Sequence, residues 1–477
     1  MNKANLFSDI KTFYITIGLC ITFHSILAQS TNTEYFMSTS FAKTSINPAK
    51  RPESGYIGIP GLTNISVDFK TNTLNLNHFL FPGVGENGKT GLFLNENVSY
   101  NDFMKNISSK NYLGLNMNAT LLGCGWFYTN DLFLSFDLST RVNAGVNIPK
   151  DFFDFAKKGL STDKDGETYD LSDLKTNVNA FTQIGFGGSY LIMDRSLVVG
   201  SKLKILLGHA YADLQIEDLR IDINNDLWTV TTQASGNILA PKLQVGYSQT
   251  GSLNHLDFGG SFSLFNGWGL GLDLGATFKP GDYFNFTDEL DWLYPLTISA
   301  ALTDIGFISW NTSKMTSFAT NPTEIIVTGD HTISIDEPTD FFKEIKNTVH
   351  DIIAFYPVNY PGIISGLGCR LNWGLEYAFM DDQMNAGFLN TVYFNPAKTI
   401  SEFTIAGAYR PANVVELGLS YSFVHSSFQT IGFALHLGPG FYIASDYIIP
   451  YVNSSFLPTS SKALNIQLGG VIPIGNK

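Results

Sequence analysis

Charged residues are scarce in this sequence of 477 residues. They make up 15% of the chain, whereas soluble globular proteins have roughly 25%. Aromatic residues make up 14%, which excludes a disordered chain, because disordered segments are poor in aromatics and rich in charge. The 29 Lys and Arg residues are outnumbered by 42 Asp and Glu residues. Nucleic acid is therefore not an expected partner, because a phosphate backbone is bound through clustered positive charge.

Cysteines and metal-binding motifs are also scarce. Only Cys124 and Cys369 lie outside an apolar N-terminal stretch, which is too few for a disulfide framework. The histidines are scattered and no pair has the spacing of metal ligands, so we expect neither a metal nor a cofactor. His425 beside Ser426 and Ser427 comes nearest to a lipase triad, but His and Ser are ordinary at strand ends. The sequence therefore predicts no enzyme.

The longest apolar run is at the N-terminus. Lys3 and Lys11 precede the run 13–27, and Ala28 and Gln29 follow it. A basic start, an apolar middle and a small residue at the end are typical of a secretory signal peptide. The run of about 15 residues is shorter than the roughly 20 that a membrane-spanning helix needs. We therefore assign residues 1–28 to a signal peptide that is cleaved between Ala28 and Gln29.

The mature chain instead shows apolar residues at every second position. Between Leu132 and Ile148 the even positions are mostly apolar and the odd positions mostly polar. This alternation predicts a strand with one apolar and one polar face. The pattern recurs at 178–192, 256–264, 268–278, 367–379, 403–409, 415–423, 431–437 and 464–472. Several stretches reach the length of about 9 to 11 residues that a tilted membrane strand requires.

The composition of the two faces predicts where each one points. The polar face is rich in Gly, Ser and Asn and places charges opposite bulky apolar residues. A soluble sandwich explains one such stretch but poorly explains so many, whereas a closed barrel turns its apolar face to lipid and its polar face to the lumen. We predict an all-β, transmembrane antiparallel barrel over residues 65–477, located in the cell outer membrane. Aromatic residues near strand ends suit the interfacial girdles, namely Trp126, Tyr128, Trp268, Tyr409, Tyr421 and Tyr447.

The predicted strands are joined by short and long connections in alternation. Residues 129–131 and 193–196 have the composition of tight turns, as expected on the periplasmic side. The long loops are 149–177, with a short helix opened by Pro149, and 311–362. Within the second loop, the spacing of apolar residues predicts a helix over 340–353.

The segment 29–64 does not alternate and precedes the first predicted strand. It contains Asn47, Pro48 and Ala49, followed by a stretch rich in Pro and Gly. A segment of this length could fold back into the lumen as a hatch or plug.

The order of signal peptide, Asn-Pro-Ala segment and Gly-rich barrel resembles the long-chain fatty-acid transporter FadL and the related PorV-type barrels of gram-negative bacteria. More closely, it resembles an uncharacterised FadL-like outer-membrane family known only as a domain of unknown function. The stretches that carry the resemblance are 200–208, 271–280 and 302–307. The resemblance implies about 14 strands and an N-terminal hatch, and the alternating stretches number about 14 to 17.

Charged residues fall on the predicted lumenal face of several strands. They are Asp137, Arg141, Asp273, Arg370, Glu376, Glu402 and Glu416. Such residues either form a polar path or pair with one another to fill a narrow barrel. A fatty acid would need an apolar pocket with basic groups near its carboxylate. Lys202, Lys204 and Arg370 have the right chemistry for that role.

The function predicted from these features is a passive channel, transporter or binder for hydrophobic, fatty-acid-like small molecules, gated by the N-terminal hatch. The alternative is a non-transporting interaction barrel, similar to PorV, that holds a protein during secretion or surface assembly. The expected partners are outer-membrane lipid and a hydrophobic ligand, and in the alternative a periplasmic or secretion-system protein.

Overall fold

The computed structural model describes residues 31–475 with gaps. The gaps are 73, 75–77, 79, 82, 84–90, 94, 96, 159–165, 194, 225–226, 241–243, 248–252, 258–264, 285–287, 321–322, 329–354, 361, 381, 395–398, 413, 425–427, 439 and 449–461. The helix predicted over 340–353 lies outside the described residues.

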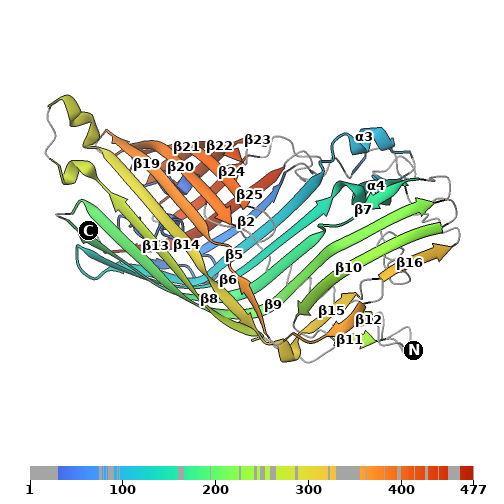
Figure 1. Ribbon diagram of the computed structural model, residues 1–477. Coiled ribbons are helices and arrows are strands. Elements are labelled where there is room, and N and C mark those ends of the chain that lie inside the picture. The colour runs from blue at the N-terminus through green and yellow to red at the C-terminus, as the bar shows by residue number, and fades with distance from the viewer. Residues whose placement is uncertain are drawn as a thin grey trace.

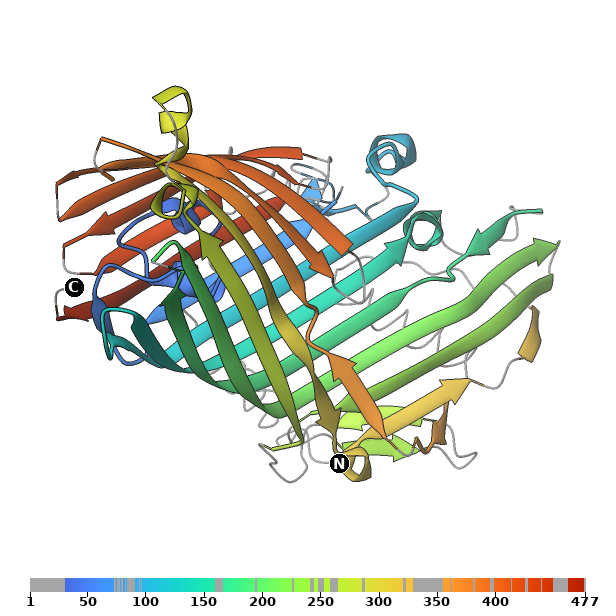
Figure 2. The same cartoon turned by 60° about the vertical axis from the view of Figure 1, so that its left-hand side comes forward.

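Within the described part of the chain, fourteen antiparallel strands close into a barrel (Figures 1 and 2). In order around the wall they are β2 (Asn64–Thr71), β5 (Lys110–Phe127), β6 (Leu132–Pro149), β8 (Lys175–Ile192), β9 (Leu197–Asn224), β13 (Gly267–Phe278), β14 (Leu296–Trp310), β19 (Arg370–Phe379), β20 (Met384–Phe394), β21 (Thr399–Ala412), β22 (Val415–Val424), β23 (Phe428–Leu437), β24 (Phe441–Tyr447) and β25 (Ala463–Ile474). The ring closes where β2 pairs with β25 on one side and with β5 on the other. The transmembrane barrel predicted from the alternation is confirmed.

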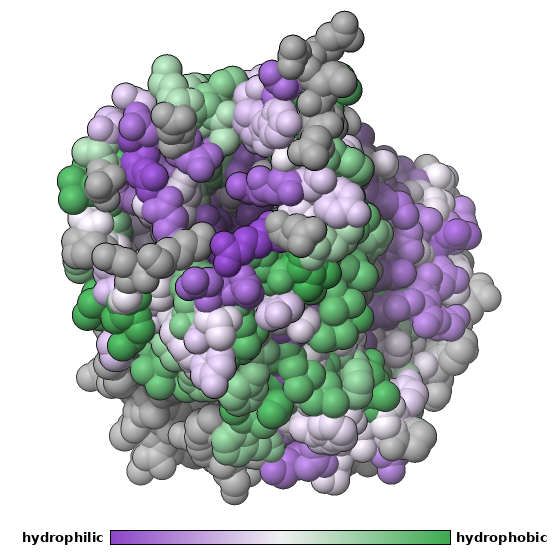
Figure 3. All heavy atoms as spheres, turned by 90° about the vertical axis from the view of Figure 1, so that its left-hand side faces the viewer, coloured by the Kyte–Doolittle hydropathy of each residue, from purple (hydrophilic) through white to green (hydrophobic). Residues whose placement is uncertain are grey.

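The alternating sequence pattern becomes two surfaces of the wall. On β22, Leu419, Tyr421 and Phe423 are exposed, whereas Ser420 and Ser422 between them are buried. The buried positions face the lumen and the exposed positions face outward, where a soluble protein would not place so many apolar side chains. In the view onto the end of the barrel where the chain terminates, hydrophobic residues form broad areas beside separate hydrophilic ones (Figure 3).

The first wall strand is interrupted. β1 (Gly55–Gly58) pairs with β25 and β5 in the same gap that β2 fills further along. The residues between them, 59–63, bulge out of the ladder. Five residues of the range 29–64, Gly55–Gly58 and Asn64, therefore belong to wall strands. We call the barrel end at which β1 begins and β25 ends the terminal end, and the other the loop end.

At the loop end, β9 continues beyond the ring and carries a side sheet (Figure 1). This sheet contains β7 (Thr168–Asp170), β10 (Leu227–Leu239), β15 (Thr316–Thr320), β16 (Thr323–Thr328) and β17 (Phe355–Val358). The helix α4 (Lys150–Lys158), predicted after Pro149, packs its Phe152 and Phe155 against this sheet. The long strands thus build structure outside the membrane as well as within it.

The remaining elements are short. They are α3 (Tyr100–Met104), the 3-10 turns η1 (Thr33–Phe36), η2 (Ala42–Ser45), η4 (Pro280–Asp282), η5 (Asp288–Leu293) and η6 (Thr312–Lys314), and the strands β3 (Leu80–Phe81), β4 (Gly91–Leu92), β11 (Gln244–Tyr247), β12 (Leu253–Asp257) and β18 (Ile363–Gly366). No helix among the described residues is long and apolar enough to cross a membrane. The stretch 256–264, predicted as a wall strand, is not one in its described part, because β12 pairs only with β11 in a separate sheet.

Two irregular positions correct the simple alternation. On β14 the register shifts opposite Asp273, so that Thr303 and Asp304 are both buried in succession, with Asp304 at a φ of 58°. On β24 the pairing with β25 shifts before Tyr447, whose side chain is buried. Tyr447 was predicted to join the interfacial girdle, but the shift turns it inward, where its hydroxyl donates to Glu402 over 2.8 Å. A bulge adds one residue to a strand and so changes which side chains face inward.

Candidate functional site in the lumen

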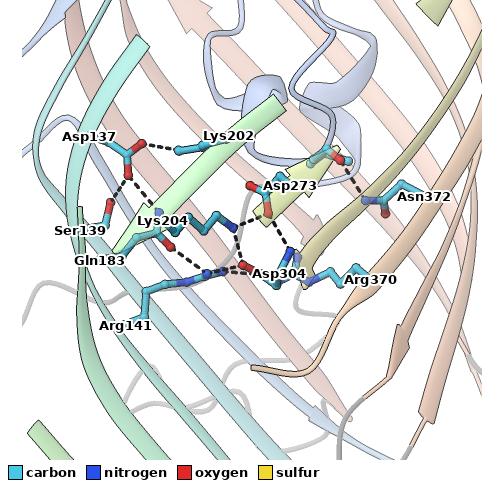
Figure 4. Close-up of polar contacts among 11 residues, drawn as sticks. Asp137, Ser139, Arg141, Gln183, Lys202, Lys204, Asp273, Asp304, Arg370 and Asn372 are labelled. Carbon is cyan, nitrogen blue, oxygen red and sulfur yellow. Dashed lines mark hydrogen bonds and ion pairs between the residues drawn. The ribbon is translucent and has the colours of Figure 1, made fainter. Parts of the chain in front are cut away.

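A cluster of seven charged side chains crosses the lumen (Figure 4). This charged cluster consists of Asp137, Arg141, Lys202, Lys204, Asp273, Asp304 and Arg370, which come from β6, β9, β13, β14 and β19. Four are cations and three are anions, so the charged cluster carries one excess positive charge.

Asp304 lies at the centre of the charged cluster. Arg141 donates to both of its carboxylate oxygens, at 2.6 and 3.0 Å, and Lys204 contacts it at 2.6 Å. Arg370 lies 3.7 Å away, and Lys204 also reaches Asp273 at 2.5 Å. A carboxylate surrounded by three cations is strongly held, because each pairing offsets the cost of burying the charges.

A glycine allows a second ion pair to form across a whole strand. Lys202 on β9 pairs with Asp137 on β6, and β8 runs between these two strands. Gly185 of β8 lies at the crossing, and a Cβ there would stand 2.6 Å from both the Asp137 carboxylate and the Lys202 side chain. Any larger residue at this position would therefore displace the ion pair.

An apolar layer lies next to the charged cluster on the loop side. One inward position beyond Gln183 and Lys204 on their strands come Phe181 and Leu206, both fully buried. They pack with Ile308 and Trp310 of β14. The Arg141 guanidinium is 5.9 Å from the centre of the Phe181 ring. The lumen therefore changes from charged to apolar within one layer of side chains.

On the other side of the lumen, the N-terminal segment, residues 31–54, lies against the inner face of the wall (Figure 2). Its polar contacts reach strands β14, β19, β20, β21, β22, β23, β24 and β25. Since these strands surround half of the lumen, the segment fills the interior on this side.

Two wall carboxylates hold this segment with the same pattern of contacts. Asp446 accepts the backbone N–H groups of Asn32 and Thr33, at 2.7 and 3.0 Å, and the Thr33 hydroxyl at 2.7 Å. Glu416 accepts the backbone N–H groups of Ser38 and Thr39, at 2.7 and 2.9 Å, and the Thr39 hydroxyl at 2.5 Å. We call Asp446 and Glu416 the clamp carboxylates. Both are almost completely buried, so these charge-assisted bonds replace the water that each carboxylate lost.

Between the clamp carboxylates, a histidine contributes a further contact. His436 of β23 lies 3.0 Å from Glu34 through Nε2 and 3.1 Å from the Thr39 hydroxyl through Nδ1. Glu34 is completely buried. The segment thus places its own acid against the wall, and this acid is satisfied there by the imidazole.

Apolar side chains of the segment pack on a patch of small residues. Tyr35, Phe36, Met37 and Ile46 form one buried cluster with the apolar wall patch, which consists of Leu389, Ala406, Ala408, Ala434 and Ala444. Alanines on the inner face leave room for the larger side chains of the segment. The contact between segment and wall is therefore apolar at its centre, with the clamp carboxylates holding the backbone.

The Asn-Pro-Ala turn of the segment fits against two wall glycines. Asn47 donates to the backbone carbonyls of Ala276 and Ala300, at 3.3 and 3.4 Å. A Cβ at Gly275 would overlap the Asn47 amide, and one at Gly200 would overlap the backbone of Pro48. These glycines allow the turn to approach the wall closely.

Two lysines of the segment respond differently to burial. Lys50 pairs with Glu376 at 2.6 Å; burial opposes its charge, but Glu376 outweighs burial and raises the Lys50 pKa. Within the described part of the chain, Lys43 donates only to the carbonyls of Met37 and Ser38, at 3.1 and 2.8 Å. Burial, followed by repulsion from Lys50, lowers the Lys43 pKa to about 8.

The space between the segment and the charged cluster is small. A cavity of about 80 Å³ is bounded by Phe41 and Thr44 of the segment and by the charged cluster. A second cavity of about 190 Å³ lies at the terminal end, where Thr39, Phe41 and Glu53 face the ends of β22, β23 and β25. Pockets for small ligands usually measure about 300–1,000 Å³, so neither cavity accommodates a long hydrocarbon chain.

The structure places the residues selected from the sequence in two groups. The charged cluster contains six of them, namely Asp137, Arg141, Asp273, Lys202, Lys204 and Arg370. The second group lies at the N-terminal segment: Glu376 and Glu416 contact it from the wall, and Asn47, Pro48 and Ala49 form its turn. Sequence reasoning missed Asp304, Asp446 and His436. Thr303 and Asp304 did carry a signal, because two successive polar residues break the alternation. Among the described residues, no three His, Cys, Asp or Glu side chains gather as a metal site requires.

Comparison with known proteins gives the family. A family model described as a family of unknown function, DUF5723, matches residues 48–446. The chain belongs to the DUF5723 family. No curated protein matches this DUF5723 sequence.

Solved structures with a similar course of the chain are distant. They include the toluene transporter TodX of P. putida (10% identity, 94% of this chain and 97% of that chain covered, TM-score 0.34) and the monoaromatic hydrocarbon channel CymD (8%, 92% and 94%, 0.32). The translocator domain of the autotransporter NalP from Neisseria meningitidis is also among them (6%, 89% and 90%, 0.31). At these values, the description of this DUF5723 barrel rests on its own strand pairing.

Proposed function

We propose that this chain is a passive outer-membrane channel or binder for hydrophobic, fatty-acid-like small molecules, and that the N-terminal segment is its hatch. The apolar wall patch carries this proposal. Tyr35, Phe36 and Met37 cover the patch, and their departure would expose it to the lumen. A hydrocarbon chain would then replace these side chains on the patch and keep apolar surface away from water.

The charged cluster supports an acidic head group on the cargo. Its single excess positive charge is balanced by one carboxylate, and Lys202, Lys204 and Arg370 are the cations proposed to meet it. Phe181 and Leu206 in the next layer offer apolar contacts to the part of the cargo's hydrocarbon chain that adjoins the head group. An amphiphile with a single negative charge fits this succession of layers.

The small cavities support gating by displacement. With the segment docked, the space of about 80 Å³ beside the charged cluster is too small for such a cargo. Passage therefore requires the segment to leave the apolar wall patch. The chain would work without an energy source, by diffusion of the cargo along its own gradient.

Uptake of a hydrophobic fluorescent dye by cells that produce the protein tests the gate. A Glu416→Gln, Asp446→Asn double variant should take up N-phenyl-1-naphthylamine faster than the wild type, because both clamp carboxylates lose their charge. Asp102→Asn, at an exposed position of helix α3, is the matched control and should leave uptake unchanged. Trypsin cleavage after Lys50 reports separately whether the segment has been released. Release without faster uptake would contradict the proposal.

Native mass spectrometry of the detergent-purified protein tests the cargo. A retained fatty acid or hydrocarbon supports the channel, and Lys204→Ala should reduce the retained fraction of an acidic ligand. A co-purifying protein with no retained small molecule would instead support the interaction barrel.

A further inference from the structure

One connection at the terminal end differs from its neighbours. Five wall connections at this end, those after Phe127, Ile192, Phe379, Ala412 and Leu437, contain two to four residues. The connection between β13 and β14, residues 279–295, is several times longer and includes η4 and η5. In Figures 1 and 2 its described parts, 279–284 and 288–295, project beyond the ends of the neighbouring strands. Joining two adjacent wall strands does not require such a long connection, because short turns join the other strand pairs at this end.

The long connection exposes aromatic side chains. We define the aromatic ledge as Tyr283, Phe284, Leu290, Trp292 and Tyr294, which are between 41% and 58% exposed. Its backbone is nevertheless folded, since Tyr283 and Phe284 donate N–H groups to the Pro280 carbonyl at 3.1 and 2.9 Å. Gly281 lets the backbone of Tyr294 approach closely, because a Cβ there would lie 2.5 Å from the Tyr294 Cα. The aromatic ledge is therefore a built surface.

The aromatic ledge continues the outward face of the wall. The rings of Tyr283 and Phe284 lie 6.3 and 6.4 Å from that of Phe278. Phe278 has the same parity on β13 as the exposed Leu272 and Leu274. Its partner on β14 is Ile298, which is 42% exposed. The ledge is thus attached to the side of the barrel that meets lipid.

Other strands end in exposed aromatic residues at the same end of the barrel. Tyr128 is 71% exposed, and Tyr190, Phe379, Tyr409 and Phe441 are also exposed. Tyr and Trp favour the membrane–water interface, where an apolar ring and a polar group are both accommodated. The aromatic ledge therefore adjoins an interfacial girdle on the same side of the barrel.

We infer that the described parts of this connection, 279–284 and 288–295, lie in the lipid headgroup layer at the terminal end and insert the aromatic ledge among zwitterionic phospholipids. Zwitterionic lipid fits the charge, because the connection has four acidic residues (Asp282, Asp288, Glu289 and Asp291) against Lys279. Anionic headgroups would be repelled. The inference is independent of what the lumen conducts, because it rests only on the outer face of the barrel.

Depth-dependent fluorescence quenching tests this inference. In a Cys124→Ala, Cys369→Ala background, a bimane label is placed in turn at Trp292→Cys, at Tyr128→Cys as girdle control, and at Glu217→Cys as water-exposed control. Each full-length protein is reconstituted in phosphatidylcholine vesicles with or without bromine on the acyl chains. The labels at 292 and 128 should lose fluorescence to brominated lipid by roughly two-fold and resist iodide, because both lie at the interface. The label at 217 should respond to iodide alone.

Quenching at 292 by iodide and not by brominated lipid would overturn the inference. Protection of that label only after addition of a periplasmic extract would also overturn it, because a protein would then cover the aromatic ledge. Replacing phosphatidylcholine by phosphatidylglycerol should not increase lipid quenching, and an increase would contradict the zwitterionic preference. If the cysteine variant fails to fold, Trp292→Phe replaces it. The fraction of tryptophan fluorescence quenched by brominated lipid should then fall relative to the unchanged chain.

Discussion

The two sides of the lumen satisfy their buried charges in different ways. Around Asp304, wall residues pair with wall residues, so the charged cluster is complete without the N-terminal segment. The clamp carboxylates instead accept backbone N–H groups of that segment, so segment and wall depend on each other. A charge that is satisfied within the wall stabilises the barrel, whereas a charge satisfied by the segment stabilises only the docked state. Substitutions on the two sides should therefore affect different measurements.

The largest effect is expected at Asp304. Asp304→Asn leaves Arg141, Lys204 and Arg370 without their central anion, and breaking a buried charge network costs about 3–5 kcal/mol. Urea unfolding of the purified barrel, followed by heat-modifiable gel mobility, measures this loss. Glu416→Gln should change the unfolding free energy of the barrel much less, and equal losses would remove the distinction between the two sides.

Loss of both clamp carboxylates should release the segment without unfolding the barrel. Each contributes hydrogen bonds to a charged group, worth about 1.5–3 kcal/mol each. In the Glu416→Gln, Asp446→Asn variant we expect trypsin to cleave after Lys43 and Lys50 at least ten-fold faster, for a loss above about 1.4 kcal/mol. Unchanged cleavage would show that the apolar wall patch alone retains the segment.

Alkaline pH should strengthen docking through Lys43. The docked lysine, with its pKa lowered to about 8, loses its proton well before the free side chain with a pKa of 10.5. The cost of burying the charge is thus present below pH 8 and is relieved as the pH rises above 8. Between pH 7 and pH 9 docking should gain about 1 kcal/mol.

Trypsin cleavage after Lys50, normalised to the unfolded protein at each pH, measures this gain. Lys43→Met should show no such pH dependence. An equal pH dependence in that variant would assign the effect to other groups that surround Lys43, namely Lys50, Glu53, Glu376 and Glu416.

The smallest effect is expected from two matched phenylalanines. Phe36→Leu loosens the contact with the apolar wall patch, and Phe181→Leu loosens the apolar layer beside the charged cluster. Each should cost about 1 kcal/mol, because the volume of the side chain is nearly conserved. The first should increase trypsin cleavage of the segment, and the second should lower the urea midpoint of the barrel. A lower urea midpoint for Phe36→Leu, or faster cleavage of the segment for Phe181→Leu, would contradict the difference between the two sides of the lumen.

The wall could be predicted from the sequence because, at a regular strand position, the polarity of the side chain indicates whether it faces the lumen or the outside. Glu416 and Asp273 were therefore predicted to face the lumen correctly. Bulges were harder to predict: at Asp304 the signal is the pair of successive polar residues Thr303 and Asp304, whereas at Tyr447 an aromatic residue suits either face and does not mark the register shift. The clamp contacts were hidden for another reason, since the donors on the segment are backbone amides, which every residue except proline has.

The bulge on β14 changes which positions of the strand face inward, from odd-numbered to even-numbered residues. Before it, Thr297, Ser299 and Ala301 face inward at odd positions; after it, Ile308 and Trp310 face inward at even positions. The Trp310 indole donates to Ser365 inside the barrel over 2.8 Å. Deleting one residue at the bulge would reverse the two faces of the rest of β14 and turn this indole outward into the lipid. In this barrel the length of the chain between two points is therefore under as strict a constraint as the identity of its residues.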